Sequence, residues 1–308
     1  MAEWWYEDGV GEARAALVDD GRILAARIEL PGTFRVGTVA SARLAERQIA
    51  TLDDGTEVML DRAPAGVTLG ARLTVEVVRE AIPEPGRAKR AKARITDAAP
   101  AAGPDLRARV AATGHPVRVL LPHQPDALEA AGWSEVLDEA TSGEIAFPGG
   151  ALRMSPTPAM TLFDVDGEGD LAALSVRAAT AVAEAIRRHG IGGSIGIDFP
   201  TLAGKAPRQA VAAALDAALP PPFERTAVNG FGFLQIVRPR PRASLPELLR
   251  ADPVGAAARA ALRTIERVPP GSPNRHRLAA AVRARLESHP DWLAALVQRT
   301  GRVPTFDA

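Results

Sequence analysis

The runs Met160-Thr-Leu-Phe-Asp-Val165 and Ser194-Ile-Gly-Ile-Asp-Phe199 decide the fold of this chain. Each is a short apolar run, which is typical of a buried strand. Residues 170–189 between them have the spacing of a helix, and Gly190 is a residue that commonly ends one. The apolar face of this helix is expected to carry Leu171, Leu174, Ala178, Val182 and Ile186. A strand, a helix and a second strand predict a parallel pair in one sheet.

An aspartate stands at the C-terminal end of each predicted strand. Asp164 and Asp198 are therefore expected to meet, because the carboxyl ends of neighbouring parallel strands open into the same crevice. Two adjacent carboxylates repel unless a cation lies between them, and Mg²⁺ accepts an all-oxygen site. Asp166 shares the strand face of Asp164 and is a further candidate catalytic residue. The sequence predicts a metal site on Asp164 and Asp198, with Mg²⁺ as the expected ion and Mn²⁺ as the alternative.

Three other interpretations of this acidic turn stay open. The pattern Asp-x-Asp-Gly is also that of a polar turn from strand to helix, with Asp170 as the helix N-cap. A calcium-binding loop that starts at Asp164 has Ser175 where a bidentate glutamate belongs. Residues 167–172 match the dinucleotide-binding pattern G-x-G-x-x-A, although the acids around that turn would repel a pyrophosphate.

Composition limits the classes of protein and of site. The chain has 308 residues, of which 46% are hydrophobic, so it can bury a core and divide into two or more units. It has no cysteine, which excludes disulfides, thiolate nucleophiles and cysteine-bound zinc from its own side chains. Lysine plus arginine and aspartate plus glutamate are equal at 37, so the overall charge does not favour nucleic acid. The absence of a signal pattern and of an apolar run of about 18 residues predicts a cytoplasmic protein without membrane contact.

The rest of the chain alternates between β-rich and helical patterns. Residues 12–30 predict two strands around an Asp-Asp-Gly turn. Short β-rich pieces between residues 37 and 97 predict a small barrel of the OB type. Its strands are expected at 37–42, 47–52, 57–60, 72–80 and 91–95. Helices are expected at 106–113, 125–131, 133–140 and 208–219, strands at 117–121 and 230–237, and helical structure from residue 245 onward.

Basic side chains that could bind RNA phosphates fall into three groups. One lies beside the last barrel strand, one follows Asp198, and one ends the strand predicted at 230–237. They are Arg87, Lys89, Arg90, Lys92 and Arg94; Lys205 and Arg208; and Arg238 and Arg240. A solvated charged edge or an exposed helix start explains each group equally well when it is taken alone. Together with a nearby carboxylate site, the groups favour a polyanionic substrate.

The order of these motifs resembles that of the ribonuclease E/G family, endoribonucleases that cut single-stranded RNA with magnesium. The resemblance runs over most of residues 12–242. Residues 16–24, Ala-Leu-Val-Asp-Asp-Gly-Arg-Ile-Leu, look like the opening hairpin of the family. Residues 161–166 and 192–199 resemble the approaches to its two metal-binding aspartates, which fall on Asp164 and Asp198. The stretch Phe231-Gly-Phe-Leu-Gln-Ile-Val-Arg238 is similar to the strand that follows them in the family.

This resemblance implies both a fold and an activity. The fold is of the α/β (α+β) class, with an RNase H-like unit at 1–33 and 98–146, an inserted OB-type barrel at 34–97, a DNase I-like catalytic unit at 147–242 and a helical tail at 243–308. The activity is Mg²⁺-dependent cleavage of single-stranded RNA by metal-activated water, which leaves a 5′ phosphate and a 3′ hydroxyl.

The sequence also departs from the family pattern. An arginine near the site is Gly230 here, Asp166 replaces an asparagine, and residues such as Thr51 and Asp54 stand where the barrel has stacking aromatics. The segment that senses an RNA 5′ monophosphate has no room, and a homo-oligomer would lack the cysteine zinc link of the family. A non-catalytic RNA-binding or assembly protein on the same fold is therefore the alternative function.

Overall fold

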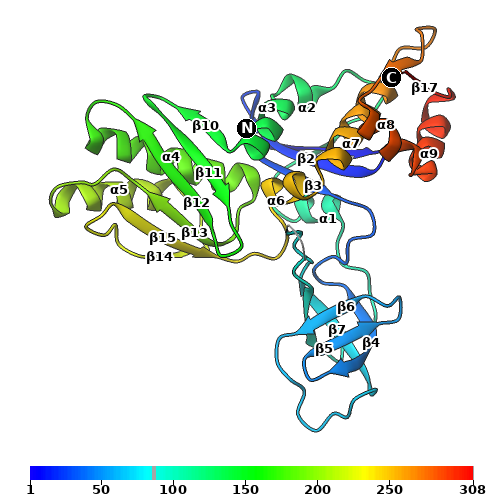
Figure 1. The fold of residues 1–308 in the computed structure, drawn as a ribbon, viewed down its shortest axis with the longest axis horizontal. Helices are drawn as coiled ribbons and strands as arrows, with labels where there is room; N and C mark the ends of the chain where they lie inside the picture. The colour runs from blue at the N-terminus through cyan, green and yellow to red at the C-terminus, as the bar shows by residue number, and fades with distance from the viewer. Residues whose placement is uncertain (85–87, 308) are drawn as a thin grey trace. The chain divides into compact units, whose positions relative to one another are not determined.

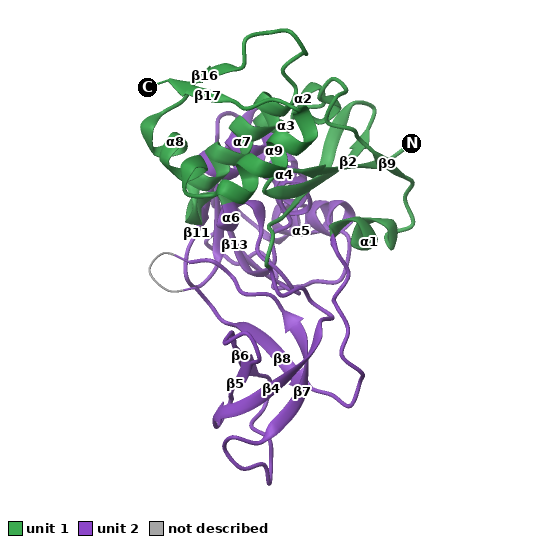
Figure 2. Ribbon diagram, turned by 90° about the vertical axis from the view of Figure 1, so that its right-hand side faces the viewer, with its two compact units in different colours: residues 1–32, 106–134, 249–308 green, residues 33–105, 135–248 purple. Residues whose placement is uncertain are grey.

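The computed structural model describes residues 1–84 and 88–307. It has a mixed α/β fold, which confirms the predicted class, and divides into two compact units (Figure 2). Unit 1 comprises residues 1–32, 106–134 and 249–308, and unit 2 comprises residues 33–105 and 135–248. No helix among the described residues is both long enough and apolar enough to cross a membrane.

Unit 1 contains a four-stranded sheet with the order β3-β2-β1-β9. Its strands are β1 (Glu3–Gly9), β2 (Glu12–Asp19), β3 (Arg22–Glu29) and β9 (Val117–Val119). The hairpin β2–β3 confirms the predicted one, and its turn has positive φ at Asp20 (47°) and Gly21 (73°), as hairpin turns with the correct twist require. Strand β1, which was not among the expected strands, buries Trp4, Tyr6 and Glu7 and pairs with both β2 and β9.

Helix α1 (Leu106–Ala111) packs on the sheet of unit 1. It buries Leu106 and Val110 against Trp4, Tyr6 and neighbouring strand residues. Helix α2 (Ala127–Ala130) also belongs to unit 1, whereas α3 (Trp133–Ser142) begins in unit 1 and continues into unit 2. After α6 (Leu245–Ala251), which begins in unit 2, the C-terminal part of unit 1 forms α7 (Pro253–Glu266), α8 (Ala280–Glu287) and α9 (Pro290–Thr300), with a small sheet of β16 (Arg275–Arg277) and β17 (Thr305–Asp307).

A buried ion network joins α7 to the first two strands. Glu12 accepts a hydrogen bond from Nε of Arg259 at 3.0 Å and forms an ion pair with Arg263. Arg14 bonds to Glu7 at 3.2 Å on the neighbouring strand. Buried charges are stable only when they are paired, so this network fixes the C-terminal helices to the N-terminal hairpin within unit 1.

Unit 2 contains a closed five-stranded barrel and a six-stranded sheet. The barrel strands are β4 (Val39–Glu46), β5 (Ile49–Leu52), β6 (Glu57–Leu60), β7 (Arg72–Arg79) and β8 (Ala91–Ile95), in the order β4-β5-β6-β8-β7 (Figure 2). Small and aliphatic side chains such as Ala42, Leu44, Ala50 and Val58 fill its interior. All five expected barrel strands are confirmed: β6 and β8 have the predicted bounds, and the bounds of β4, β5 and β7 differ by a few residues at the ends.

The six-stranded sheet has the order β10-β11-β12-β13-β15-β14. Its strands are β10 (Glu144–Phe147), β11 (Gly150–Pro156), β12 (Thr161–Gly167), β13 (Gly193–Asp198), β14 (Glu224–Arg225) and β15 (Phe233–Arg238). Strands β12 and β13 are parallel, which confirms the predicted pair, and the other neighbours are antiparallel. Helices α4 (Leu171–His189) and α5 (Lys205–Ala218) pack on the apolar face of this sheet (Figure 1).

Helix α4 is fixed at both ends. The Asp170 side chain accepts hydrogen bonds from the backbone N–H groups of Ala172 and Ala173, and Gly190 ends the helix in the left-handed conformation at φ 67°. Asp170 is thus the N-cap that the turn interpretation predicts. The prediction that Leu171 lies on the buried face is wrong: Leu171 is 43% exposed, because it is the first helical residue and lies beyond the edge of the core.

Candidate metal centre

The two predicted metal aspartates are neighbours in the sheet. Asp164 on β12 and Asp198 on β13 are direct partners in the parallel register. The row extends on both sides, to Arg153 on β11 and to Phe233 on β15. Partners on adjacent strands lie about 5 Å apart and project from the same face of a sheet. These four side chains therefore form one continuous row across four strands.

The row lies on the face opposite the helices. Phe163 and Val165 alternate with the aspartates of β12 and are buried in the core, as Ile197 is on β13. Asp164 and Asp198 consequently project from the other face, and both are exposed. Alternation along the strand thus places the carboxylates toward solvent.

The surface beside the two carboxylates is apolar and tightly packed at Gly196. A Cβ atom at this position would lie 2.7 Å from the Phe233 ring and 2.8 Å from the Leu162 side chain. Only glycine fits there without displacing one of the two side chains, because such short carbon contacts are strongly repulsive. Gly196 therefore keeps Leu162 and Phe233 packed beside the aspartate pair.

Arg153 is a site residue that the sequence did not reveal. Its Nε donates to Glu144 at 3.1 Å, and this bond raises the pKa of Arg153, with further contributions from the negative charges of Asp166 and Asp164. The guanidinium is therefore close to both acids of β12. The sequence signal that could have found Arg153 is the alternation of this charged residue with apolar Leu152 and Met154, which is typical of a strand that is buried on one face.

The aspartate pair fits a magnesium ion. Asp166 is also exposed and projects from the same face, two residues beyond Asp164. Within residues 1–84 and 88–307, no group of three or more histidine, aspartate or glutamate side chains gathers at metal-binding geometry. Mg²⁺ is commonly held by one or two carboxylates, with water and substrate phosphate as the other ligands. Asp164 and Asp198 provide that donor set.

A tight loop presents an exposed aromatic ring near the row. The Asn229 side chain accepts hydrogen bonds from the backbone N–H groups of Phe231 (2.9 Å) and Phe233 (3.0 Å). Gly232 has φ 94°, and a Cβ atom there would lie 2.1 Å from the carbonyl oxygen of Phe199, the residue after Asp198. The loop is thus packed against the end of β13, and Phe231 is 84% exposed. The strand predicted from residue 230 therefore begins only at Phe233.

Lys205 and Arg208 lie on the first turns of α5, and the Arg208 side chain lies close to Gly230. A Cβ atom at Gly230 would lie 3.6 Å from Nη1 of Arg208, so this guanidinium occupies space beside the glycine. Both basic residues line a pocket of about 500 Å³. On its wall, Arg225 forms two hydrogen bonds with Asp216, at 2.6 and 2.5 Å, which lower the pKa of Asp216 and raise that of Arg225. No ion pair of Lys205 or Arg208 occurs within the described chain.

The basic residues of the barrel are mostly paired. Arg87 lies outside the described residues. The pairs are Lys89–Glu84 (2.5 Å), Arg90–Glu57 (2.7 Å) and Arg94–Glu76 (2.7 Å). Lys92 forms no ion pair with any residue that the structure describes. Its charge is therefore the least compensated of the four described cations in this group.

The last group of basic residues is partly buried. Arg240 forms an ion pair with Glu247, which also accepts a hydrogen bond from the backbone N–H of Ser244 at 2.8 Å. Arg238 is the last residue of β15, and burial, followed by the positive charge of Arg187, lowers its pKa. Arg240 thus stabilises the start of α6, and its charge is compensated there.

Comparison with known proteins adds no identification. No family model matches the chain, and no curated protein matches its sequence significantly. The candidate site is therefore defined by its own residues: the pair Asp164 and Asp198, with Arg153, Asp166 and Phe231 around it.

Proposed function

We propose that the chain is a Mg²⁺-dependent endoribonuclease that cuts single-stranded RNA at Asp164 and Asp198. The observation that carries this proposal is the direct register of these two aspartates at the carboxyl ends of parallel strands. Paired exposed carboxylates suit a cation whose other ligands are water and phosphate. The resemblance of the motif order to the ribonuclease E/G family supports RNA as the polymer.

We also propose the finer architecture that the resemblance implies. An RNase H-like assignment for residues 1–33 and 98–146 is supported by three antiparallel strands joined by a parallel fourth. An OB-type assignment for residues 34–97 is supported by the closed five-stranded barrel. A DNase I-like assignment for residues 147–242 rests on the mixed sheet with its two helices.

The residues of the row have distinct roles in this proposal. Mg²⁺ bound there would polarise the scissile phosphate and lower the pKa of a bound water. Asp164 and Asp198 would hold the ion, and Asp166 would accept a hydrogen bond from a water molecule at the site. Arg153 donates to a phosphate oxygen, where a cation stabilises developing negative charge. In the overall hydrolysis, a water oxygen would bond to phosphorus while the bond from phosphorus to the 3′ oxygen breaks. The water would lose one proton to solvent and the 3′ oxygen would take one up, which leaves a 5′ phosphate and a 3′ hydroxyl.

Two other groups are suited to hold the RNA chain. The exposed ring of Phe231 offers a face on which a base can stack, a contact that any base can make. Lys205 and Arg208 carry charges that no described carboxylate neutralises, so they can bind flanking phosphates. Because neither contact reads base edges, we expect low sequence specificity.

The test is cleavage of a labelled, unstructured RNA by the purified full chain, with and without Mg²⁺. Asp164→Asn and Asp198→Asn should each abolish cleavage, whereas Asp166→Asn should have a milder effect, because the resemblance places an asparagine there. Glu168→Gln, an exposed carboxylate in the same turn, is the matched control and should cut at the wild-type rate. Equal cleavage by the wild type and both variants would rule out the aspartate pair as the active site.

A non-catalytic RNA-binding or assembly protein is the second candidate. Gly230 stands where the resemblance expects an arginine, and this departure from the family pattern favours the second candidate. The two candidates predict opposite results, because removing negative charge near bound RNA strengthens binding. If the wild type cuts no RNA in Mg²⁺ or Mn²⁺, while Asp164→Asn and Asp198→Asn bind RNA more tightly, the second candidate is supported.

A further inference from the structure

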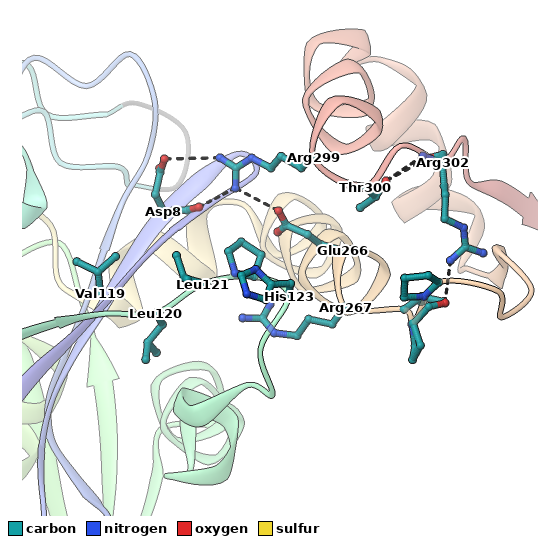
Figure 3. A pocket seen from close by; sticks show the side chains of 14 residues that line it. Asp8, Val119, Leu120, Leu121, His123, Glu266, Arg267, Arg299, Thr300 and Arg302 are labelled. Carbon is teal, nitrogen blue, oxygen red and sulfur yellow. Dashed lines mark hydrogen bonds and ion pairs between the residues drawn. The ribbon is translucent and has the colours of Figure 1, made fainter.

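A pocket in unit 1 and a pocket in unit 2 offer different groups to a ligand. The first has a volume of about 640 Å³, and the three arginines that line it already bond to the protein (Figure 3). These guanidinium groups therefore stabilise the fold of unit 1. Their bonds run from Arg299 to Asp8 and Glu266, from Arg267 to Glu7, and from Arg302 to the backbone carbonyls of Pro269 and Ser272.

The pocket in unit 2 has a volume of about 500 Å³ and lies along helix α5. Its lining on α5 runs from Lys205 to Asp216 at the spacing i, i+3, i+4, i+7, i+8 and i+11, which places these side chains on one face of the helix. The other lining residues come from β14 and the segment that follows it. The pocket is therefore a groove between α5 and residues 225–228, and its volume is within the usual range of small-molecule sites.

Two cations line the start of this groove without a counter-charge. Lys205 and Arg208 form no ion pair with any carboxylate in residues 1–84 and 88–307. The first turn of α5 has no acidic residue, and Gly204 caps it without a side-chain hydrogen bond. Because the N-terminus of a helix carries partial positive charge, cations in this turn lower stability. Residues that oppose local stability are commonly functional, and an anion would neutralise these two.

The carboxylate at the other end of the groove is neutralised. Asp216 lies eight residues beyond Arg208, or about 12 Å along the helix axis. Arg225 donates to both oxygens of Asp216, at 2.6 and 2.5 Å, and to the backbone carbonyl of Thr226 at 3.0 Å. This pair therefore forms a wall of the groove and does not repel an anion that binds at Lys205 and Arg208.

The surface between the two ends is apolar, with one amide beside the cations. Four small or aliphatic side chains leave room for a planar ring, and the Gln209 amide can hydrogen bond to a hydroxyl group. Inorganic phosphate would leave this apolar surface unused, and a neutral ring would leave the cations unneutralised. A nucleoside phosphate satisfies both parts. The four side chains are those of Ala212, Ala213, Ala227 and Val228.

The groove is continuous with the candidate metal centre. Arg208 lines the groove and lies 3.6 Å from the position of a Cβ atom at Gly230. The next residue is the exposed Phe231, and Gly232 packs against the carbonyl of Phe199, the residue that follows Asp198. An RNA strand that is bound at the aspartate pair and stacked on Phe231 would therefore reach the groove with its next nucleotide.

We propose that this groove binds one nucleotide, with its phosphate on Lys205 and Arg208 and its base against the apolar surface. The nucleotide is either part of an RNA strand or a free mononucleotide. The RNA source rests on the proposed function, whereas binding itself requires neither metal nor cleavage. Alanine and valine side chains cannot hydrogen bond to base edges, so the groove should accept purines and pyrimidines alike.

Calorimetric titration of the full chain in EDTA with AMP, adenosine and inorganic phosphate tests the two halves of the groove. AMP should bind, and adenosine and phosphate should each bind roughly 10-fold more weakly or less, because each lacks one half. Arg208→Gln removes a charged donor and should weaken AMP binding by roughly 10-fold. Arg277→Gln, at an exposed arginine of β16 in unit 1, is the matched control and should bind AMP like the wild type.

A tryptophan that fills the groove tests the place of binding. Ala213 and Ala217 are both exposed and lie one turn apart on α5, but only Ala213 lines the groove. Ala213→Trp should abolish AMP binding in EDTA, and Ala217→Trp should bind AMP like the wild type. The same variants are titrated with a ten-residue oligoadenylate that has hydroxyl groups at both ends.

The pattern of losses identifies the source of the nucleotide. Weaker binding of the oligoadenylate to Ala213→Trp than to Ala217→Trp assigns the groove to RNA, and a loss for AMP alone assigns it to a free nucleotide. Equal binding of both ligands by the two variants, equal affinities of AMP and adenosine, or no binding of either ligand at millimolar concentration would overturn the proposal. The comparison of AMP with adenosine uses the wild type, so it holds even if a variant fails to fold. Since every titration is in EDTA, a failure to cut RNA in Mg²⁺ leaves these results unchanged.

Discussion

The buried network between α7 and the first two strands makes a strong prediction about stability. The Glu12 side chain is 2% exposed and lies between Arg259 and Arg263, which are 4% and 9% exposed. Glu12→Gln keeps the shape of the side chain but removes its charge, and it leaves two guanidinium groups buried without compensation. Breaking a buried pair in this way costs about 3–5 kcal/mol. The free energy of unfolding of unit 1 should fall by that amount.

Tryptophan fluorescence during urea unfolding measures this change in unit 1 alone. Trp4, Trp5, Trp133 and Trp292 are the only tryptophans of the sequence, and all belong to unit 1. At an m-value of about 1–3 kcal/mol per M, the loss should lower the urea midpoint by about 1 M or more. Glu287→Gln is the control within unit 1: its pair with Arg283 on α8 is 60% and 34% exposed, so it should change stability by less than about 1 kcal/mol. A change at Glu12 as small as that of the control would refute the reasoning.

Three further predictions concern the metal, the RNA and pH. Mg²⁺ should raise the melting temperature of the wild type, and Asp164→Asn and Asp198→Asn should each weaken this response. An equal Mg²⁺-induced shift of the melting temperature in all three proteins would contradict the site. RNA affinity should fall with salt, and Lys92→Gln should reduce the slope of log K against log salt by about 0.7. Arg94→Gln should reduce it less, because Glu76 already compensates the charge of Arg94. Equal effects of the two variants in a filter-binding series would contradict this. Burial acts to raise the pKa of Asp126, but the charge of Arg14 and its hydrogen bond outweigh burial and lower the pKa below the ordinary 3.8. The ionised Asp126 therefore stabilises the fold above about pH 3.8, and this contribution is lost as the pH falls further. The stability difference between wild type and Asp126→Asn should therefore shrink below about pH 4, and a constant difference from pH 7 to pH 3 in urea unfolding would argue against it.

The part of the site that could be predicted from sequence depends on neighbours along the chain. Strand β12, helix α4 and strand β13 follow one another, and a strand, a helix and a strand in this order give a parallel pair. That rule was sufficient to bring Asp164 beside Asp198. The caps of α4 at Asp170 and Gly190 are local signals of the same kind.

The part that could not be predicted depends on long-range register. Arg153 joins the row only because β11 pairs with β12 in one particular antiparallel register, and a shift by one residue would move its side chain to the other face. Phe231 belongs to an apolar run that predicts a buried strand, but the hydrogen bonds of Asn229 and the close approach at Gly232 turn the chain before β15 begins. The exposed ring is a consequence of that turn.

Pairing of charges was also invisible in the sequence. The basic residues at 89–94 form a cluster when read along the chain, yet three of the four described members are compensated: Arg90 and Arg94 by carboxylates on other barrel strands, and Lys89 by Glu84. Similarly, the arginines of α7 recur at helical spacing, but their partner Glu12 lies about 250 residues away in the sequence. Apart from Lys89–Glu84, these pairs do not follow from local pattern, because each requires the tertiary fold.

Replacing one ligand of the proposed metal by a softer one tests most directly whether Asp198 holds a catalytic ion. The chain has no cysteine, so Asp198→Cys introduces its only thiol. Thiolate ligands suit softer ions such as Cd²⁺ and bind Mg²⁺ poorly. The measurement is the rate of single-stranded RNA cleavage by wild type and Asp198→Cys in Mg²⁺, and in Mg²⁺ supplemented with micromolar Cd²⁺. We expect the wild type to cut in Mg²⁺, and the variant to be inactive in Mg²⁺ and to regain cleavage with Cd²⁺. Undiminished cleavage by the variant in Mg²⁺, or no cleavage by the wild type with any of these ions, would contradict a catalytic metal at Asp164 and Asp198.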